Sequence, residues 1–161
     1  MESGGVKTAI CGAYFGCQTP DDRHGEWNER MYQTLHQEQS VLRSMGYRIV
    51  FLADFNAHVG NDPSTGIVGN NPDVNPNGTR FLDFLHRTSM RHIKGMRHLS
   101  SGFWSRQRGH SKSVLDYGVI SEEHLPSVVS MLVYSDGYFG GGSDHNWLFL
   151  VLSDKFLNSG G

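Results

Sequence analysis

Two short apolar segments flank a stretch of helical periodicity near the start of the chain, and this order constrains the fold more than any other feature. Residues 7–15 and 48–53 are apolar and short, as in strands that are covered on both faces. Between them, residues 26–44 carry apolar side chains at helical spacing, and Gly46 suits the end of a helix. A strand, loop, helix and strand in succession predict a βαβ-like unit of an α/β domain.

The remaining sequence predicts a long loop, a second helix and several short strands. Residues 54–78 are rich in Asn, Asp, Gly and Pro, and long loops in compact domains are often functional. The sequence Asn77-Gly78-Thr79 is expected to open a helix over residues 80–88. Short strands are expected at residues 96–99, 102–105, 113–120, 128–134 and 147–152. Strands with hairpin-like connections after a βαβ unit indicate a mixed sheet, so the expected fold class is α/β (α+β) in a single domain, residues 1–161.

Composition excludes several classes of protein. A net charge of −2 with nine Phe, six Tyr and three Trp argues against a disordered chain. No apolar run approaches the ~18–20 residues of a membrane span, and the start Met-Glu-Ser-Gly-Gly lacks the basic and apolar regions of a signal peptide. Cys11 and Cys17 make no disulfide framework. We therefore expect an intracellular protein, nuclear or cytoplasmic, with no membrane partner.

Basic residues gather in the middle of the chain. Residues 80–112 hold eight Lys or Arg and a single acid, Asp83, whereas the rest of the chain holds six basic and fifteen acidic residues. A basic segment on an acidic body is typical of a surface that binds a polyanion. The alternative, given equal weight, is a solvated surface whose charges pair with acids elsewhere in the fold.

A carboxylate and an amide follow the second apolar segment. Asp54 and Asn56 stand two residues apart, and residues i and i+2 of a strand share a face, so both side chains are expected to point the same way. Strand ends line the crevice where α/β domains bind ligands. An Asp-x-Asn at such a place is more often a turn former, because both side chains bond their own backbone.

Two further acids and a histidine occupy similar places. Asp116 stands among apolar residues in the predicted strand 113–120, where an acid needs a partner to offset its burial. Asp144 and His145 follow three glycines, residues 140–142, just before the last predicted strand. Taken alone, Asp116 is more often a buried structural acid, and Ser-Asp-His is a surface loop or a fragment of a hydrolytic triad.

In this order the segments resemble the endonuclease/exonuclease/phosphatase, or DNase-I-like, superfamily. The Gly-Asp-Phe-Asn motif of that family is similar to residues 53–56, and its Trp followed by Asp-Tyr is similar to Trp104 and residues 116–117. The Ser-Asp-His signature stands at residues 143–145, and Tyr14 matches the tyrosine that the family carries on the strand before the first motif.

The resemblance covers about residues 7–153. The sequences of residues 53–60 and 115–121 are most similar to endonuclease domains of non-LTR retrotransposons. The fold implied is a portion of a four-layered α/β sandwich with mixed, largely antiparallel sheets. The activity implied is metal-dependent hydrolysis of DNA phosphodiesters by an endonuclease, with the remainder of a retrotransposon polyprotein, which carries a reverse transcriptase, as a partner.

The resemblance also implies a role for each matched residue. Asp54 would orient or deprotonate the attacking water, Asn56 would position it, and His145 would donate to a phosphoryl oxygen with its tautomer fixed by Asp116. Tyr14 would hydrogen-bond the phosphate or the leaving oxygen.

The implied metal is Mg²⁺ or Mn²⁺ near Asp144, because hard cations prefer carboxylate and water oxygens. Trp104, Arg106 and Arg108 would contact the DNA, Trp104 through a base or sugar, although burial of Trp104 in the core is equally expected. Phosphate contacts from the basic segment would supply affinity without sequence preference.

The sequence also departs from the family. Nothing here matches the N-terminal half that supplies an Asn and a metal-binding Glu, and the glutamates at 26, 29 and 38 follow the tyrosine strand and are not assigned that role. Ala53 replaces the usual Gly. A partial domain has two alternatives to an active endonuclease. One is a catalytically inactive module that binds nucleic acid or another partner, and the other is a phosphomonoesterase of the same superfamily.

Overall fold

The computed structural model describes residues 7–61, 73–96, 98–102, 104–134 and 143–153. The predicted glycine-rich approach at 140–142 and residues 62–72 of the predicted loop 54–78 lie outside these residues. The elements in chain order are β1 (Lys7–Tyr14), α1 (Gly25–Ser44), β2 (Tyr47–Asp54), α2 (Pro76–Thr88), β3 (Met90–His92), β4 (Ser100–Ser101), β5 (Arg106–Arg108), β6 (Ser111–Ser113), β7 (Asp116–Ser121), a 3-10 helix (Glu122–Ser127), β8 (Val128–Tyr134) and β9 (Trp147–Leu152).

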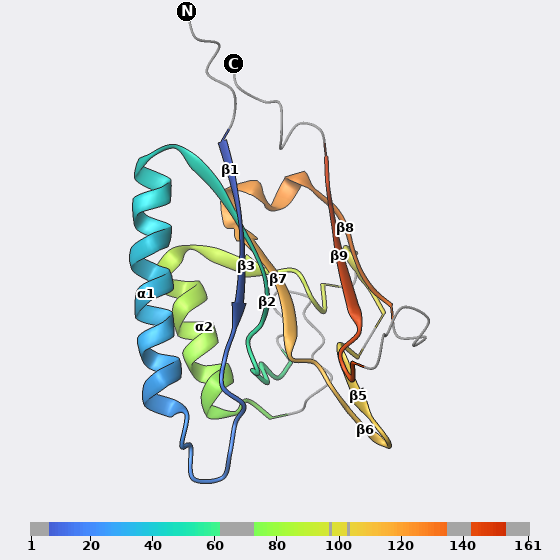
Figure 1. Ribbon diagram of the computed structural model, residues 1–161. Helices are drawn as coiled ribbons and strands as arrows, with labels where there is room; N and C mark the ends of the chain where they lie inside the picture. The colour runs from blue at the N-terminus through green and yellow to red at the C-terminus, as the bar shows by residue number, and fades with distance from the viewer. Residues whose placement is uncertain (1–6, 62–72, 97, 103, 135–142, 154–161) are drawn as a thin grey trace, which may run out of the picture.

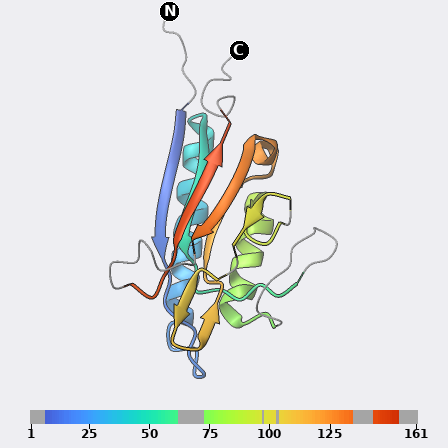
Figure 2. The ribbon, with the colours of Figure 1, turned by 90° about the vertical axis from the view of Figure 1, so that its right-hand side faces the viewer.

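The described elements form three layers (Figure 1). Helices α1 and α2 cover one face of a four-stranded sheet of order β1-β2-β7-β3, and a three-stranded sheet of order β4-β8-β9 covers the other face. The hairpin β5-β6 extends beyond the end of the layers (Figure 2). Two strand pairs, β1-β2 and β4-β8, are parallel and the other four are antiparallel. The predicted class, a portion of an α/β sandwich with mixed, largely antiparallel sheets, is confirmed.

The predicted βαβ unit is present as β1-α1-β2. The two strands run parallel in register from Lys7 opposite Tyr47 to Tyr14 opposite Asp54. α1 ends at Ser44, and Gly46 adopts a φ of +80° that lets the chain reverse into β2. Because the unit depends on local periodicity and one turn glycine, sequence alone was enough to predict it.

Several predicted boundaries in the middle of the chain are wrong. The described residues of 96–99 and 102–105 form no strand, since turns and a Gly102 φ of +77° precede β5, and the predicted strand 113–120 is divided between β6 and β7. β3 was not predicted because its three residues carry no period of their own. The strands predicted at 128–134 and 147–152 have those bounds in the structure.

An aromatic core fills the space between the helices and the four-stranded sheet. Phe55 lies at its centre, fully buried, with ring centroids 5.2 Å from Phe15 and 4.3 Å from Phe81. The buried ring of Tyr117 packs at 5.0 Å from Phe81, and its hydroxyl donates to the Ala57 carbonyl at 2.7 Å. The residues on either side of Asn56 are thereby fixed by packing, so the end of β2 stands on a rigid base.

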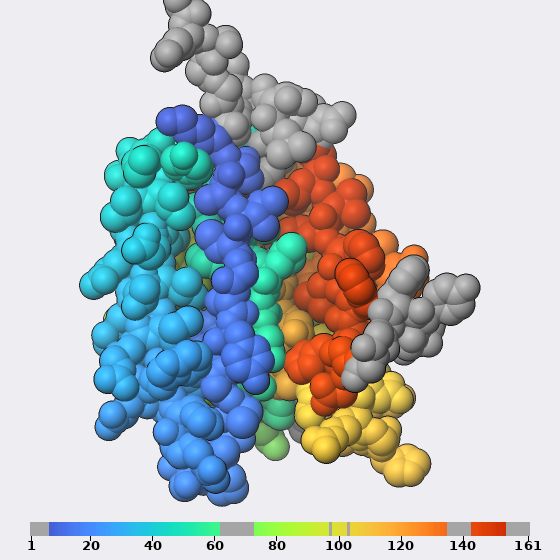
Figure 3. Space-filling view, in the orientation of Figure 1, coloured from blue at the N-terminus to red at the C-terminus, as the bar shows by residue number. Residues whose placement is uncertain are grey.

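A second, aliphatic core lies between the two sheets. Val50 of β2, Ile120 of β7 and Met131 of β8 are almost completely buried there, and alternate residues of β9 pack against them. At the β1 edge, however, Ile10 and Tyr14 are 73% and 65% exposed. Figure 3 shows this edge and β9 on either side of a groove. The β1 edge therefore leaves part of the sheet face toward β9 uncovered.

Helix α2 begins four residues earlier than predicted, at Pro76. Asn75 is the N-cap, with its side chain accepting the Gly78 N–H at 2.7 Å, and Pro76 occupies the first helical position, where a missing N–H costs nothing. The same Asn75 side chain accepts the His58 N–H at 3.1 Å. The cap therefore joins the start of α2 to the loop that follows Asn56.

We expect Gly78→Ala to destabilise the fold strongly. A Cβ at position 78 would stand 1.8 Å from the His58 carbonyl oxygen, so the backbone of the loop must move. The expected loss of unfolding free energy is about 3 kcal/mol, as for severe overpacking, measured by urea denaturation. Gly12→Ala is the matched control, because its Cβ would meet only Leu52 O at 3.9 Å. Equal stability of the two variants would contradict this packing.

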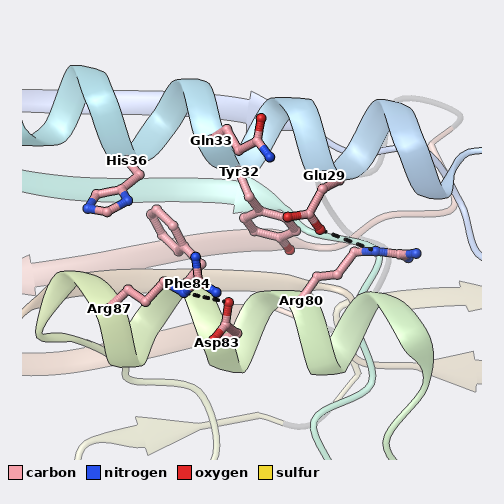
Figure 4. Close-up of a pocket in the computed structure, with 8 residues that line it drawn as sticks. All are labelled: Glu29, Tyr32, Gln33, His36, Arg80, Asp83, Phe84 and Arg87. Carbon is pink, nitrogen blue, oxygen red and sulfur yellow. Dashed lines mark ion pairs between the residues drawn. The ribbon is translucent and has the colours of Figure 1, made fainter.

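A crevice of about 40 Å³ lies between α1 and α2 (Figure 4). It holds two ion pairs, Arg80 with Glu29 at 3.8 Å and Arg87 with Asp83 at 2.9 Å, and the figure shows their side chains facing one another across or along the helices. Its small volume and compensated charge indicate helix packing rather than a ligand site. Its lining consists of Glu29, Tyr32, Gln33, His36, Arg80, Asp83, Phe84 and Arg87.

Most of the described basic residues in the segment 80–112 form ion pairs with acids of the fold, as the second interpretation of this segment expected. Arg91 pairs with Glu122 at 2.8 Å, and Lys94 is buried with its ammonium donating to the Gly102 carbonyl. In the described part of the chain, no helix has the length and apolar character needed to cross a membrane.

Candidate active site

Two carboxylates from different parts of the sequence meet at one edge of the four-stranded sheet. Asp54 is the last residue of β2 and Asp116 the first of β7, and the antiparallel register places them directly opposite each other. Their side chains are only 10% and 14% exposed. Two acids side by side with so little solvent form an electrostatically costly pair, which is typical of a functional site.

Asn56 lies beside Asp54, as predicted, but not because the two share a strand face. β2 ends at Asp54, and Asn56 adopts a φ of +47°, in the left-handed region. Its backbone N–H donates to Asp54 Oδ1 at 2.9 Å, and its side-chain Nδ2 donates to Asp54 Oδ2 at 3.1 Å and to the Phe15 carbonyl at 2.7 Å. Both oxygens of Asp54 are thus oriented by one residue.

The imidazole of His145 completes the cluster. His145 Nδ1 lies 3.1 and 3.0 Å from the two oxygens of Asp116, so Nδ1 carries the proton and donates it to the carboxylate. His145 Nε2 lies 3.8 Å from Asp54 Oδ2. The imidazole therefore stands between the two acids, with its tautomer fixed by one of them and its second nitrogen turned toward the other.

Burial dominates the electrostatics of this cluster. It raises the pKa of Asp54 to about 6, with the neighbouring charge of Asp116 adding to the effect and the Asn56 N–H opposing it. Burial also raises the pKa of Asp116, against hydrogen bonds from Ser105 and His145. A carboxylate with a pKa near 6 can accept a proton close to neutral pH more readily than an ordinary Asp.

Asp54, Asp116 and His145 also form a group that can hold a metal ion. One ligand atom from each lies within 4.8 Å of the other two. Asp144, the residue predicted to be near the metal, does not belong to this group. Its Oδ2 accepts the Nε–H of Arg106 at 2.8 Å, and although desolvation raises the Asp144 pKa, the charge and hydrogen bond of Arg106 lower it below its usual range.

The other predicted residues surround the cluster at different depths. Tyr14 ends β1 beside Asp54 in the strand register and is exposed. Trp104 is half-buried and packs against the aromatic core, as the core alternative expected. Arg106 forms an ion pair with Asp144, with Nη2 lying 2.8 Å from Oδ2, whereas Arg108 is exposed at the end of β5.

Sequence reasoning missed the buried amides that support the cluster. Asn77 is 1% exposed, and its Nδ2 donates to the carbonyls of Gly16 and Asn56 at 3.0 and 3.1 Å. The buried Asn28 of α1 donates to Asn77 Oδ1 at 2.8 Å and to the Gly16 carbonyl at 3.0 Å. In the sequence, Asn77 has the pattern of a turn residue and Asn28 that of a surface helix, so only their meeting in space shows their role.

Comparisons with known proteins find solved structures that share the fold of this chain. No protein-family model and no curated protein matches the sequence. Among solved structures, the endonuclease domain of TRAS1, a telomere-specific non-LTR retrotransposon, matches with a TM-score of 0.54 at 20% identity, over 89% of this chain and 56% of that one. The 3'-5' exonuclease NExo of Neisseria meningitidis matches with a TM-score of 0.67 at 12% identity, over 93% of this chain and 62% of that one.

A third structure, the 3' phosphatase NExo (D146N) from Neisseria bound to product DNA hairpin, matches with a TM-score of 0.64 at 15% identity, over 93% of this chain and 62% of that one. The chain therefore spans about three fifths of the length of the structures it matches. At these identities the likeness concerns the fold. The chain has the fold of the endonuclease/exonuclease/phosphatase, or DNase-I-like, superfamily, as its motifs predicted.

Proposed function

We propose that this chain is a metal-dependent phosphodiester hydrolase of the endonuclease type that acts on DNA. The observation that carries the proposal is the meeting of Asp54, Asp116 and His145, whose candidate ligand atoms lie within 4.8 Å of one another although the residues are far apart in sequence. A base, an oriented imidazole and a cation site in one cluster are what hydrolysis of a phosphodiester requires.

Asp54 takes the role of general base toward water. Its two oxygens are oriented by Asn56, and burial raises its pKa to about 6. A water molecule that donates to Asp54 loses its proton to the carboxylate as its oxygen bonds to phosphorus, and the bond from phosphorus to the leaving oxygen breaks. Asn56 thus acts on the nucleophile through the orientation of Asp54.

His145 takes the role of donor to the phosphate. Asp116 accepts a hydrogen bond from Nδ1–H and fixes the orientation of the ring, and the protonated ring would donate Nε2–H to a non-bridging oxygen. As charge builds on that oxygen, the donor gains in strength because the two carboxylates are largely withdrawn from water. Tyr14, exposed beside Asp54, is assigned the hydrogen bond to the phosphate or leaving oxygen.

The donor set of the cluster fits a divalent cation. Asp54 and Asp116 offer the carboxylate oxygens that Mg²⁺ or Mn²⁺ prefers, and such an ion supplies charge stabilisation at the phosphoryl oxygens. Arg106 Nε and Nη2 both contact Asp144 Oδ2, so Asp144 would join these ligands through Oδ1 or by releasing Arg106. We therefore propose that one oxygen each of Asp54 and Asp116 would hold the cation, which leaves the other oxygen of Asp54 to accept the proton of the water, and we retain Asp144 as a further ligand.

Arg108 and Lys112, both exposed on the β5-β6 hairpin, are proposed to contact DNA phosphates. We expect the double substitution Arg108→Ala and Lys112→Ala to weaken binding of duplex DNA by a similar factor for every sequence. It should also reduce the slope of log affinity against log salt by about 2, since each phosphate contact contributes about 0.9. Fluorescence anisotropy at several salt concentrations measures both values. Affinity that is insensitive to salt in the unaltered protein would contradict the assignment.

The TRAS1 match supports a place in a retrotransposon polyprotein for the chain. That structure is an endonuclease domain of a non-LTR element, of which this chain spans 56%. We propose that the remaining part of such a polyprotein, which includes a reverse transcriptase, is the natural partner of the chain.

A phosphomonoesterase is the second candidate, since one matching structure is described as a 3' phosphatase. A labelled duplex oligonucleotide with a 3'-phosphate separates the two candidates in a single reaction with Mg²⁺. Internal cleavage supports the endonuclease, and loss of the terminal phosphate without shortening supports the monoesterase. A folded chain that binds the duplex and does neither would be a binding module, which would contradict the proposed function.

A further inference from the structure

We propose that Ser105 is a positioning residue that holds Asp116 and His145 in register with each other. The inference deepens the proposed function, on which its kinetic part rests. Ser105 is fully buried, directly before β5, and the resemblance to the superfamily assigns it no role. Each of its polar groups is hydrogen-bonded: the hydroxyl contacts Asp116, and the carbonyl contacts Asn146, the residue directly after His145.

The hydroxyl of Ser105 holds the start of β7. Its Oγ accepts the backbone N–H of Leu115 at 2.8 Å and that of Asp116 at 3.0 Å. The hydroxyl is also hydrogen-bonded to the Asp116 side chain. With two N–H groups donating to Oγ, the hydroxyl proton points to the carboxylate, so one small side chain fixes both the backbone and the acid group of Asp116.

The main chain of Ser105 holds the other half of the pair. Its carbonyl accepts the backbone N–H of Asn146 at 2.7 Å, directly after His145, and its own N–H donates to the Ser113 carbonyl at 3.1 Å. The Asn146 side chain strengthens this attachment, with Nδ2 donating to the Trp104 carbonyl at 2.6 Å.

The residue before His145 is attached to the same segment. The Gln107 N–H donates to the Asp144 carbonyl at 2.8 Å, and Arg106 and His145 form an isolated antiparallel bridge. His145 is therefore flanked on both sides by bonds to residues 104–107. Asp116 and His145, 29 positions apart in sequence, are placed through one template, in which Ser105 bonds to Asp116 on one side and to Asn146 on the other.

This geometry requires the hydroxyl, not merely a small side chain. Alanine at position 105 would keep the carbonyl bond to Asn146 but leave the N–H groups of Leu115 and Asp116 without their acceptor. Asp116 would then lose a donor and its fixed orientation toward Nδ1 of His145. Outer partners that orient a functional imidazole or carboxylate typically contribute about 10–100-fold in activity.

The test compares Ser105→Ala with Ser105→Thr, which restores a hydroxyl, in the full chain. Thr88→Val is the matched control, since Thr88 is a buried hydroxyl that donates to the Phe84 carbonyl within α2. The first readout is the ¹⁵N chemical shifts of the His145 ring in metal-free protein, which report the tautomer. The second is kcat and KM for cleavage of a DNA duplex with Mg²⁺.

We expect Ser105→Ala to fold, to lose the fixed Nδ1–H tautomer and to lower kcat about 10–100-fold with KM within twofold. Ser105→Thr should restore the tautomer and kcat, and Thr88→Val should change neither. A folded Ser105→Ala variant with the tautomer of the unaltered protein would overturn the inference, as would a loss of stability without a change in tautomer. If the unaltered chain cleaves no DNA, the proposed function fails while the ring shifts still decide the role of Ser105.

Discussion

Replacement of His145 by alanine is expected to lower the rate of DNA cleavage by about 10³-fold or more, because it removes the donor to the phosphate. The imidazole lies between the two acids, 3.0 Å from Asp116 Oδ2 and 3.8 Å from Asp54 Oδ2. Its removal also takes away the positive charge that a protonated imidazole would place between the two carboxylates. Single-turnover cleavage of a labelled duplex measures the effect without interference from product release.

His86→Ala serves as the matched control for this variant. His86 is exposed on α2 and belongs to no group of the site, so its loss should leave the rate within twofold. Asp116→Asn should approach the effect of His145→Ala, because the amide no longer selects the tautomer with a proton on Nδ1. A His145→Ala variant that keeps a third or more of the original rate would show that His145 is not a catalytic residue.

Replacement of Asp54 by asparagine is expected to lower the cleavage rate by at least about 10³-fold, since it removes the general base, and at the same time to stabilise the fold at neutral pH. Burial and the charge of Asp116 raise the folded-state pKa of Asp54 to about 6, above its value in the unfolded chain. The folded state therefore binds the proton more tightly. The contribution of Asp54 to stability is present at low pH and is lost as pH rises through about 6.

At pH 8 the ionised Asp54 therefore opposes folding, and Asp54→Asn removes that charge. The substitution also impairs a hydrogen bond from Asn56, so we expect a net gain of about 1 kcal/mol at pH 8 that disappears near pH 4. Urea denaturation in EDTA at both pH values measures it. A variant that is active, or that is less stable than the original protein at pH 8, would contradict the assigned environment of Asp54.

The sequence predicted the parts of the site that depend on local patterns. β2 is a short apolar strand with a polar end, so its position and the place of Asp54 could be predicted from periodicity. The meeting of Asp54, Asp116 and His145 followed from the order of three motifs and from the family resemblance. Each motif alone favoured a structural role.

Residues whose role depends on tertiary contacts could not be predicted. Ser105 stands in a polar sequence that favoured a strand, and its function arises from bonds to residues 10, 11 and 41 positions away. Asn56 lies beside Asp54 through a left-handed backbone conformation, not through the strand geometry that the sequence suggested. The basic segment shows the same limit, because four of its arginines form ion pairs with Asp22, Asp83, Glu122 and Asp144.

Cleavage of supercoiled plasmid by the purified 161-residue chain tests the central claim most directly. The reactions contain Mg²⁺ or EDTA, with the His145→Ala variant beside the unaltered protein and circular dichroism to show that both are folded. We expect nicked circles with Mg²⁺, none with EDTA and none with the variant. A folded chain that binds the plasmid without nicking it, or nicking that survives EDTA or the loss of His145, would contradict the claim that this cluster hydrolyses phosphodiesters with a metal ion.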